Sequence, residues 1–144
     1  MRRKSGRRRG QVVVEMLLIL PVFLGIVFTI MEIGYISFQL ILLNHAAYEA
    51  VRVGGMTYYP SKSWQGAASV MSRILPGVTL DCYTEPTVYD KQAEQQNMDL
   101  VCKATENVQL IFPISNIILA KPRGTGKRQL MTIVRMPIER PLLK

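Results

Sequence analysis

The chain has 144 residues, enough for one modest domain, and its composition changes sharply after the first ten positions. Six of its eighteen lysine and arginine residues lie within residues 1–10, and the other twelve exceed the ten acidic residues by only two. A nucleic-acid binder spreads basic residues over a folded face or interleaves them with aromatic residues, because phosphate contacts supply most of its affinity. The charge distribution therefore argues against a nucleic-acid partner.

The first predicted element is a long apolar helix directly after the basic segment. Residues 12–31 carry a single charge, and twenty residues of helix cover about 30 Å, the thickness of the hydrocarbon core of a bilayer. Positive charge before such a span holds the N-terminus in the cytoplasm. We therefore predict a single-pass protein of the cytoplasmic (inner) membrane with an extracytoplasmic C-terminal part. The segment is not a secretory signal peptide. Signal peptides have a shorter apolar core that is followed by a small-x-small cleavage site, and this chain has neither feature.

Glu15 and Pro21 are the two costly residues inside this span. An ionised carboxylate in hydrocarbon costs about 2.5 to 3.5 kcal/mol on insertion scales, and such residues are usually paired or functional. Glu15 therefore has a function, unless it reaches interfacial water or is protonated by desolvation. Pro21 removes one hydrogen bond of the helix, and it either kinks the helix or also sets how neighbouring helices pack.

Beyond the membrane, the helix is expected to continue to residue 54, because no proline occurs between Pro21 and Pro60. Ala46, Ala50 and Gly54 recur every four residues on this extension. Such spacing creates a narrow face on which another helix can approach closely. The alternative is that these small residues are neutral filler.

The residues around Gly10 resemble the processing site of type IV prepilins. Basic residues precede Gly10, an apolar helix follows it, and Glu15 is the fifth residue after the glycine. More narrowly, the N-terminal third resembles that of the TadE-like minor pseudopilins of tight-adherence pili. The residues that carry this resemblance are Arg9, Gly10, Val14, Glu15, Leu20, Pro21, Gly25, Glu32, Ile33, Gly34, Asn44, Ala46, Ala47, Glu49, Ala50 and Arg52.

The resemblance implies roles for Gly10, Gln11 and Glu15. A prepilin peptidase would cleave between Gly10 and Gln11, so that residues 1–10 are a leader. Glu15 would then serve assembly by meeting the new N-terminal amine of another subunit. The implied partners are the membrane, other pilin or pseudopilin subunits, the peptidase and the inner-membrane pilus assembly platform.

The extracytoplasmic part, residues 55–144, is predicted to be a small α+β domain. Residues 63–75 have one apolar face and indicate a short second helix with Ser63 as its N-cap. Alternating apolar residues predict a small antiparallel sheet with strands at residues 78–83, 98–105 and 129–138. The polar residues 85–97 are interpreted as a loop, and residues 122–128 as a hairpin turn, because the spacing of a phosphate-binding loop is absent.

Cys82 and Cys102 lie on the apolar faces of two of the predicted strands. An exported location permits oxidation, and closing a loop of this length would contribute about 3 kcal/mol, so we predict a disulfide between them. Two independently buried thiols are the alternative. A pair of cysteines alone has no metal-site spacing.

No set of residues with catalytic chemistry can be assembled from the sequence. There is one histidine, His45, and no nucleophile beside a histidine, no pair of acids at a glycine-rich cleft and no metal-binding cluster. We therefore predict no enzyme, no cofactor and no metal. The predicted function is that of a minor pseudopilin in the initiation, priming or support of pilus assembly. The alternative is an uncleaved, single-pass anchored domain with a binding or enzymatic function.

Overall fold

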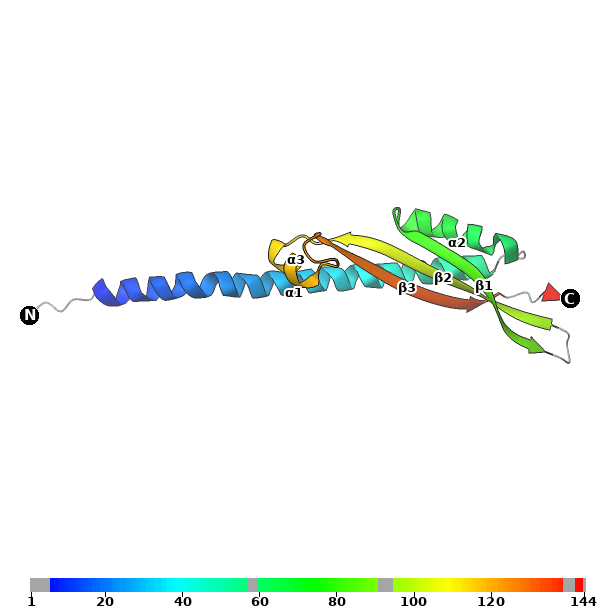
Figure 1. Cartoon of the computed structure of the whole chain (residues 1–144), viewed down its shortest axis with the longest axis horizontal. Coiled ribbons are helices and arrows are strands. Elements are labelled where there is room, and N and C mark those ends of the chain that lie inside the picture. Colours follow the sequence, from blue (N-terminus) through cyan, green and yellow to red (C-terminus); the bar gives the residue numbers. More distant parts are fainter. Residues whose placement is uncertain (1–5, 57–59, 91–94, 139–141, 144) are drawn as a thin grey trace, which may run out of the picture.

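The computed structural model describes residues 6–56, 60–90, 95–138 and 142–143. Helix α1 (Gly6–Gly55) is a rod of 50 residues, and its second half carries a small domain (Figure 1). The other elements are α2 (Pro60–Ile74), β1 (Thr79–Asp90), β2 (Gln95–Gln109), α3 (Pro113–Leu119), β3 (Lys127–Pro137) and β4 (Leu142–Leu143). The predicted α+β class, with a long N-terminal helix, a short second helix and an antiparallel sheet, is confirmed.

The sheet has the order β1-β2-β3, with every pair antiparallel, and β4 pairs with the start of β2. Burial alternates along β3, as expected for a sheet with one covered face. The covered face packs on the second half of α1 and on α2. The core consists of Leu43, Ala46, Ala47, Ala50, Val51, Ala67, Met71, Leu100, Cys102, Ala104, Val108, Leu130 and Ile138.

The small residues at the end of α1 face α2 and the sheet. Ala46 and Ala50 are fully buried. A Cβ atom on Gly54 would lie 2.8 Å from the carbonyl oxygen of Ser63 and 3.2 Å from the Cβ of Ala67, both in α2. In this structure, the helix that approaches the small-residue face is therefore α2 of the same chain.

The second helix begins earlier than predicted. It starts at Pro60, and Ser63 is fully buried inside its first turn, so the prediction of Ser63 as the N-cap is wrong. Proline is favoured at the first helical position, because its fixed φ suits the helix and it lacks an N–H that would be unpaired there.

The prediction of a loop at residues 85–97 is also wrong. β1 continues to Asp90 and β2 begins at Gln95, in register with each other apart from a shift between Pro86 and Val88. Residues 91–94 lie outside the described residues. Pro86 is tolerated because β1 is an edge strand.

The turn at residues 122–126 joins α3 to β3 and not two strands, so only the local chain reversal of the predicted hairpin is present. The Thr125 N–H donates to the Pro122 carbonyl at 3.3 Å, and the Lys121 N–H donates to the Lys127 carbonyl at 3.1 Å. Gly124 and Gly126 have φ values of +81° and +69°, which favour glycine. Helix α3, between β2 and this turn, was not predicted.

Candidate functional site

The first half of α1 is an apolar surface that the described domain does not cover. Its large apolar side chains are exposed from Val12 to Ile26, and α1 is the one helix in the described residues that is long and apolar enough to cross a membrane. Exposing a continuous apolar rod to water is unfavourable. The helix therefore anchors the chain in a membrane.

Gly10, Gln11 and Glu15 lie at the start of this rod, all exposed and all helical. A Cβ atom added to Gly10 would meet no atom of the described chain within 4 Å. Packing inside the described structure therefore does not require glycine at this position. The side chain of Glu15 makes no hydrogen bond or ion pair with the described residues, and α1 continues through Pro21 without a break.

Glu32 is a buried acid whose contacts were not predicted from the sequence. It lies one position beyond the predicted span and is fully buried. Its Oε1 accepts a hydrogen bond from the Ile111 N–H at 3.0 Å, and its Oε2 accepts one from the Phe112 N–H at 2.9 Å. Charge-assisted bonds of this kind are stronger than neutral ones. Glu32 therefore fixes the start of α3 to α1.

An aromatic contact one helical turn before Glu32 supports the same attachment. The rings of Phe28 and Phe112 are stacked, with their centroids 4.9 Å apart and 8° between their planes. In the middle of α3, the Asn116 Oδ1 accepts a hydrogen bond from the Gly126 N–H at 2.8 Å. Arg128 donates to the Leu119 carbonyl at 3.1 Å. Phe28 and Glu32 thus hold α3 on α1, and the bonds of Asn116 and Arg128 join α3 to the turn and the strand that follow it.

A signal for Glu32 was present in the sequence. It is the second acid of α1, and a carboxylate at the end of an apolar helix needs partners, because burying it unpaired is costly. The partners are backbone groups of a segment about 80 positions away, and no side-chain pattern marks them.

We predict that Glu32→Gln loosens α3. The amide has one acceptor oxygen where the carboxylate has two, so at least one of the N–H groups of Ile111 and Phe112 loses its partner. Leaving a buried donor unpaired costs about 1–3 kcal/mol. Hydrogen exchange by mass spectrometry, on the whole chain in nanodiscs, should show faster exchange at these two amides. Glu49→Gln, which removes a surface ion pair with Arg52, is the control. Unchanged exchange in Glu32→Gln would contradict the assigned attachment.

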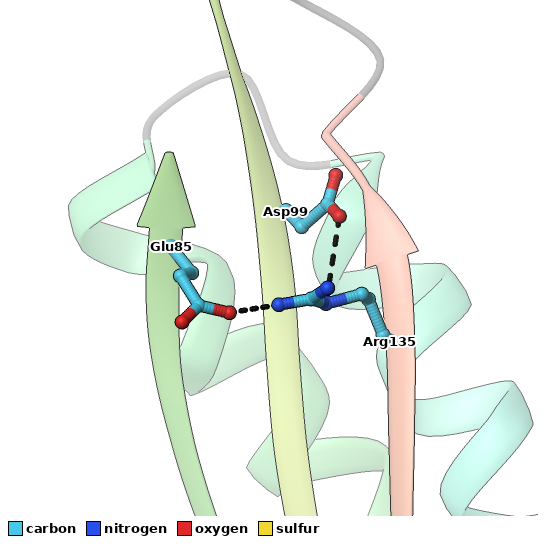
Figure 2. Close-up of polar contacts among 3 residues, drawn as sticks. All are labelled: Glu85, Asp99 and Arg135. Atoms are coloured by element: carbon cyan, nitrogen blue, oxygen red, sulfur yellow. Dashed lines mark hydrogen bonds and ion pairs between the residues drawn. The ribbon is translucent and has the colours of Figure 1, made fainter. Parts of the chain in front are cut away.

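Three charged residues meet on the outer face of the sheet (Figure 2). Arg135 of β3 lies between Glu85 of β1 and Asp99 of β2 and forms an ion pair with each, at 3.6 Å from its Nε to the Asp99 Oδ2. The side chains of Arg135 and Glu85 are 53% and 45% exposed, so water weakens their pair. The cluster links the three strands. It was not predicted, because its Glu85 was assigned to a loop.

Glu106 faces the covered side of the sheet, opposite Leu130 of β3. Burial raises the pKa of its carboxyl. Its Oε2 is buried and has no hydrogen-bond partner among the described residues. The environment therefore favours the neutral acid. The described residues include no group of three or more His, Cys, Asp and Glu side chains that could hold a metal ion.

Cys82 and Cys102 are directly opposite each other in β1 and β2, and the structure joins them in a disulfide. Cys102 is fully buried in the core. The bond connects an edge strand to the central strand of the sheet.

We predict that non-reducing peptide mapping of material freshly prepared from the cell envelope recovers the Cys82 and Cys102 peptides as one linked species. Replacing both residues with serine should lower the free energy of unfolding of the domain by about 3 kcal/mol, because the unfolded chain then loses a constraint over 20 residues. Two free thiols in the fresh material would reject the bond.

Residues 10–52 match the family of TadE-like proteins. No curated protein and no solved structure matches the chain. The matched residues include Gly10, Glu15 and Glu32, and they cover both the exposed half of α1 and most of the half that carries the domain.

Proposed function

We propose that this chain, whose residues 10–52 match the family of TadE-like proteins, is a minor pseudopilin of the tight-adherence system. It takes part in starting, priming or supporting the assembly of a tight-adherence pilus. The observation that carries the proposal is the start of α1: Gly10 without a packing neighbour, then Glu15 on an apolar rod that the described domain leaves uncovered.

Cleavage after Gly10 would remove six basic residues and create a new amine on Gln11. Gln11 and Glu15 are four residues apart in a helix, so they lie on the same face, about 6 Å apart along the axis. A processed subunit would thus present a positive and a negative group side by side. Two such subunits satisfy each other's charges only in a particular register, because unpaired charges are costly in a low dielectric.

The exposed half of α1 supports a role in which subunits meet through their helices. From Val12 to Ile26 this surface carries only apolar side chains and Pro21 beside Glu15, so neighbouring α1 helices and lipid are its compatible surroundings. The other proposed partners are the prepilin peptidase and the inner-membrane assembly platform. The leader (residues 1–10) would face the cytoplasm, residues 11–54 of α1 would form the transmembrane helix and its extension beyond the membrane, and residues 55–144 would form the extracytoplasmic domain. Residues 1–5 lie outside the described residues.

We propose no enzymatic activity. TadE-like proteins belong to a pilus-associated family that is not known to be enzymatic. The chain's single histidine, His45, lies on the exposed surface of α1.

The N-terminal mass of the protein tests the proposal. Mass spectrometry of protein extracted from native membranes should find a chain that begins at Gln11. A chain that begins at Met1, in cells whose peptidase processes other pilins, would contradict the proposal and favour an uncleaved anchored domain.

A further inference from the structure

Helix α3 exposes large apolar side chains at the end of the domain nearest the membrane span. Ile117 and Ile118 are 70% and 68% exposed, and Ile111, just before the helix, is 64% exposed. The contacts of Glu32 and Phe28 hold these residues outside the core, although burying one isoleucine is worth about 1.5–3 kcal/mol.

The position of α3 along α1 places these side chains at the level of the span. Figure 1 shows α3 beside the middle of α1. Ile118 lines an open groove with residues from Val22 to Ile30 of α1. These residues belong to the run, 12–31, that is predicted to cross the membrane.

The apolar run is too short for the hydrocarbon core to end before the part of α1 that lies beside Ile118. If the hydrocarbon ended at Val22, residues 11–21 would supply a helix of only about 16 Å, roughly half of the 30 Å needed. Ile118 must therefore lie beside hydrocarbon when α1 spans the membrane.

The segment after the isoleucines is basic. Residues 113–128 contain four basic residues and no acid. Lys121, Arg123 and Lys127 are exposed. Arg128 and Leu119 line a hollow with Ile33, Ile36 and Ser37 of α1, about 3–9 Å beyond the end of the span at Met31. The phosphates of the lipid headgroups lie at this height, because headgroups add about 5–7 Å on each side of the hydrocarbon.

We propose that α3 and the basic turn, residues 111–128, form a second contact with the membrane that α1 crosses. The isoleucines insert into the leaflet on the side of the domain, and the basic side chains bind the phosphates of anionic lipids. Apolar insertion next to basic residues is the pattern of interfacial helices. The contact fixes the height and rotation of the domain on the membrane. It requires α1 to span the membrane, but not a role in pilus assembly.

A single fluorescent label tests the insertion. The variants are Ile118→Cys and, as a control of the same residue type and similar exposure, Ile133→Cys on the outer face of β3, which is 64% exposed. Each full chain is labelled with an environment-sensitive dye without reductant and reconstituted, at a high ratio of lipid to protein, into vesicles of phosphatidylcholine and phosphatidylglycerol. Unsubstituted chain, treated identically, reports any label on Cys82 or Cys102.

Nitroxide groups on the lipid acyl chains should quench most of the emission from position 118 and little from position 133. Equal, weak quenching at both positions would overturn the insertion. Blue-shifted emission at position 118 without quenching would show that protein covers α3, and would overturn it too.

The basic residues are tested in the same assay. Quenching at position 118 should be stronger in vesicles that contain phosphatidylglycerol than in vesicles of pure phosphatidylcholine. Replacing Lys121, Arg123 and Lys127 with glutamine should remove this difference. Lys103→Gln, an exposed lysine on the outer face of β2, should keep it. If the two lipid mixtures quench the original sequence equally, the assigned contact with anionic headgroups is wrong. The N-terminal mass tests the pilin role separately.

Discussion

Replacing Gly10 with leucine should leave the leader attached to nearly all of the protein. A prepilin peptidase cleaves after a glycine, and a branched side chain at this position should prevent the peptidase from reaching the peptide bond between residues 10 and 11. The replacement should not harm the fold, because a Cβ atom at Gly10 meets no atom of the described chain within 4 Å. Leucine also favours a helix over glycine by roughly 0.5–1 kcal/mol. Mass spectrometry of membrane extracts measures the result as a chain that begins at Met1.

Gly34→Leu is the matched control for this experiment. Gly34 lies in the same helix, and a Cβ atom there also meets no atom of the described chain within 4 Å. This variant should therefore be processed normally, whatever its effect on later steps. Normal processing of Gly10→Leu would show that cleavage occurs elsewhere or not at all.

The long helix and the fold class were predictable because each depends on a local pattern. An apolar run of 20 residues predicts a helix long enough to span a membrane. Alternating apolar and polar residues predict the strands that contain Cys82, Cys102 and Leu130. These patterns follow from burial on one face. No knowledge of distant residues is needed to read them.

The outer ends of β1 and β2 were missed because residues 85–97 are mostly polar and lack the alternation of apolar residues that marks a strand. Residues 85–90 pair with β2 through backbone hydrogen bonds in the register set by the apolar part of the strands. A polar segment can form a pair of hydrogen-bonded strands as well as a loop, so composition alone does not distinguish the two. The Glu85 and Arg135 ion pair depends on that register, so it was missed with it.

Helix α3 and its attachment depend on tertiary contacts alone. Seven residues are too few for a stable isolated helix, and this one is held by Glu32, Phe28 and Asn116. The face of Ala46, Ala50 and Gly54 illustrates a related limit. Its spacing indicates that a helix approaches, but only the structure identifies α2 of the same chain.

Changing Glu15 to glutamine should abolish most piliation while protein level and leader cleavage stay near normal. The side chain keeps its shape and loses its charge, so it no longer attracts the amine of a neighbouring Gln11. Insertion should survive or improve, because an uncharged group is less costly in hydrocarbon. The fold should survive too, since Glu15 is exposed and bonds to none of the described residues.

Abundance, N-terminal mass and the number of pili should be measured in the same strain, because each separates a different role. Glu49→Gln is the matched control on α1, outside the span, and it should leave all three near normal. Normal piliation with Glu15→Gln would show that the acid is a tolerated interfacial residue. Loss of the protein would show that Glu15 serves insertion or folding, and an uncleaved chain would show that it serves recognition by the peptidase. Only the loss of pili from a stable and processed chain would assign Glu15 to contact between subunits.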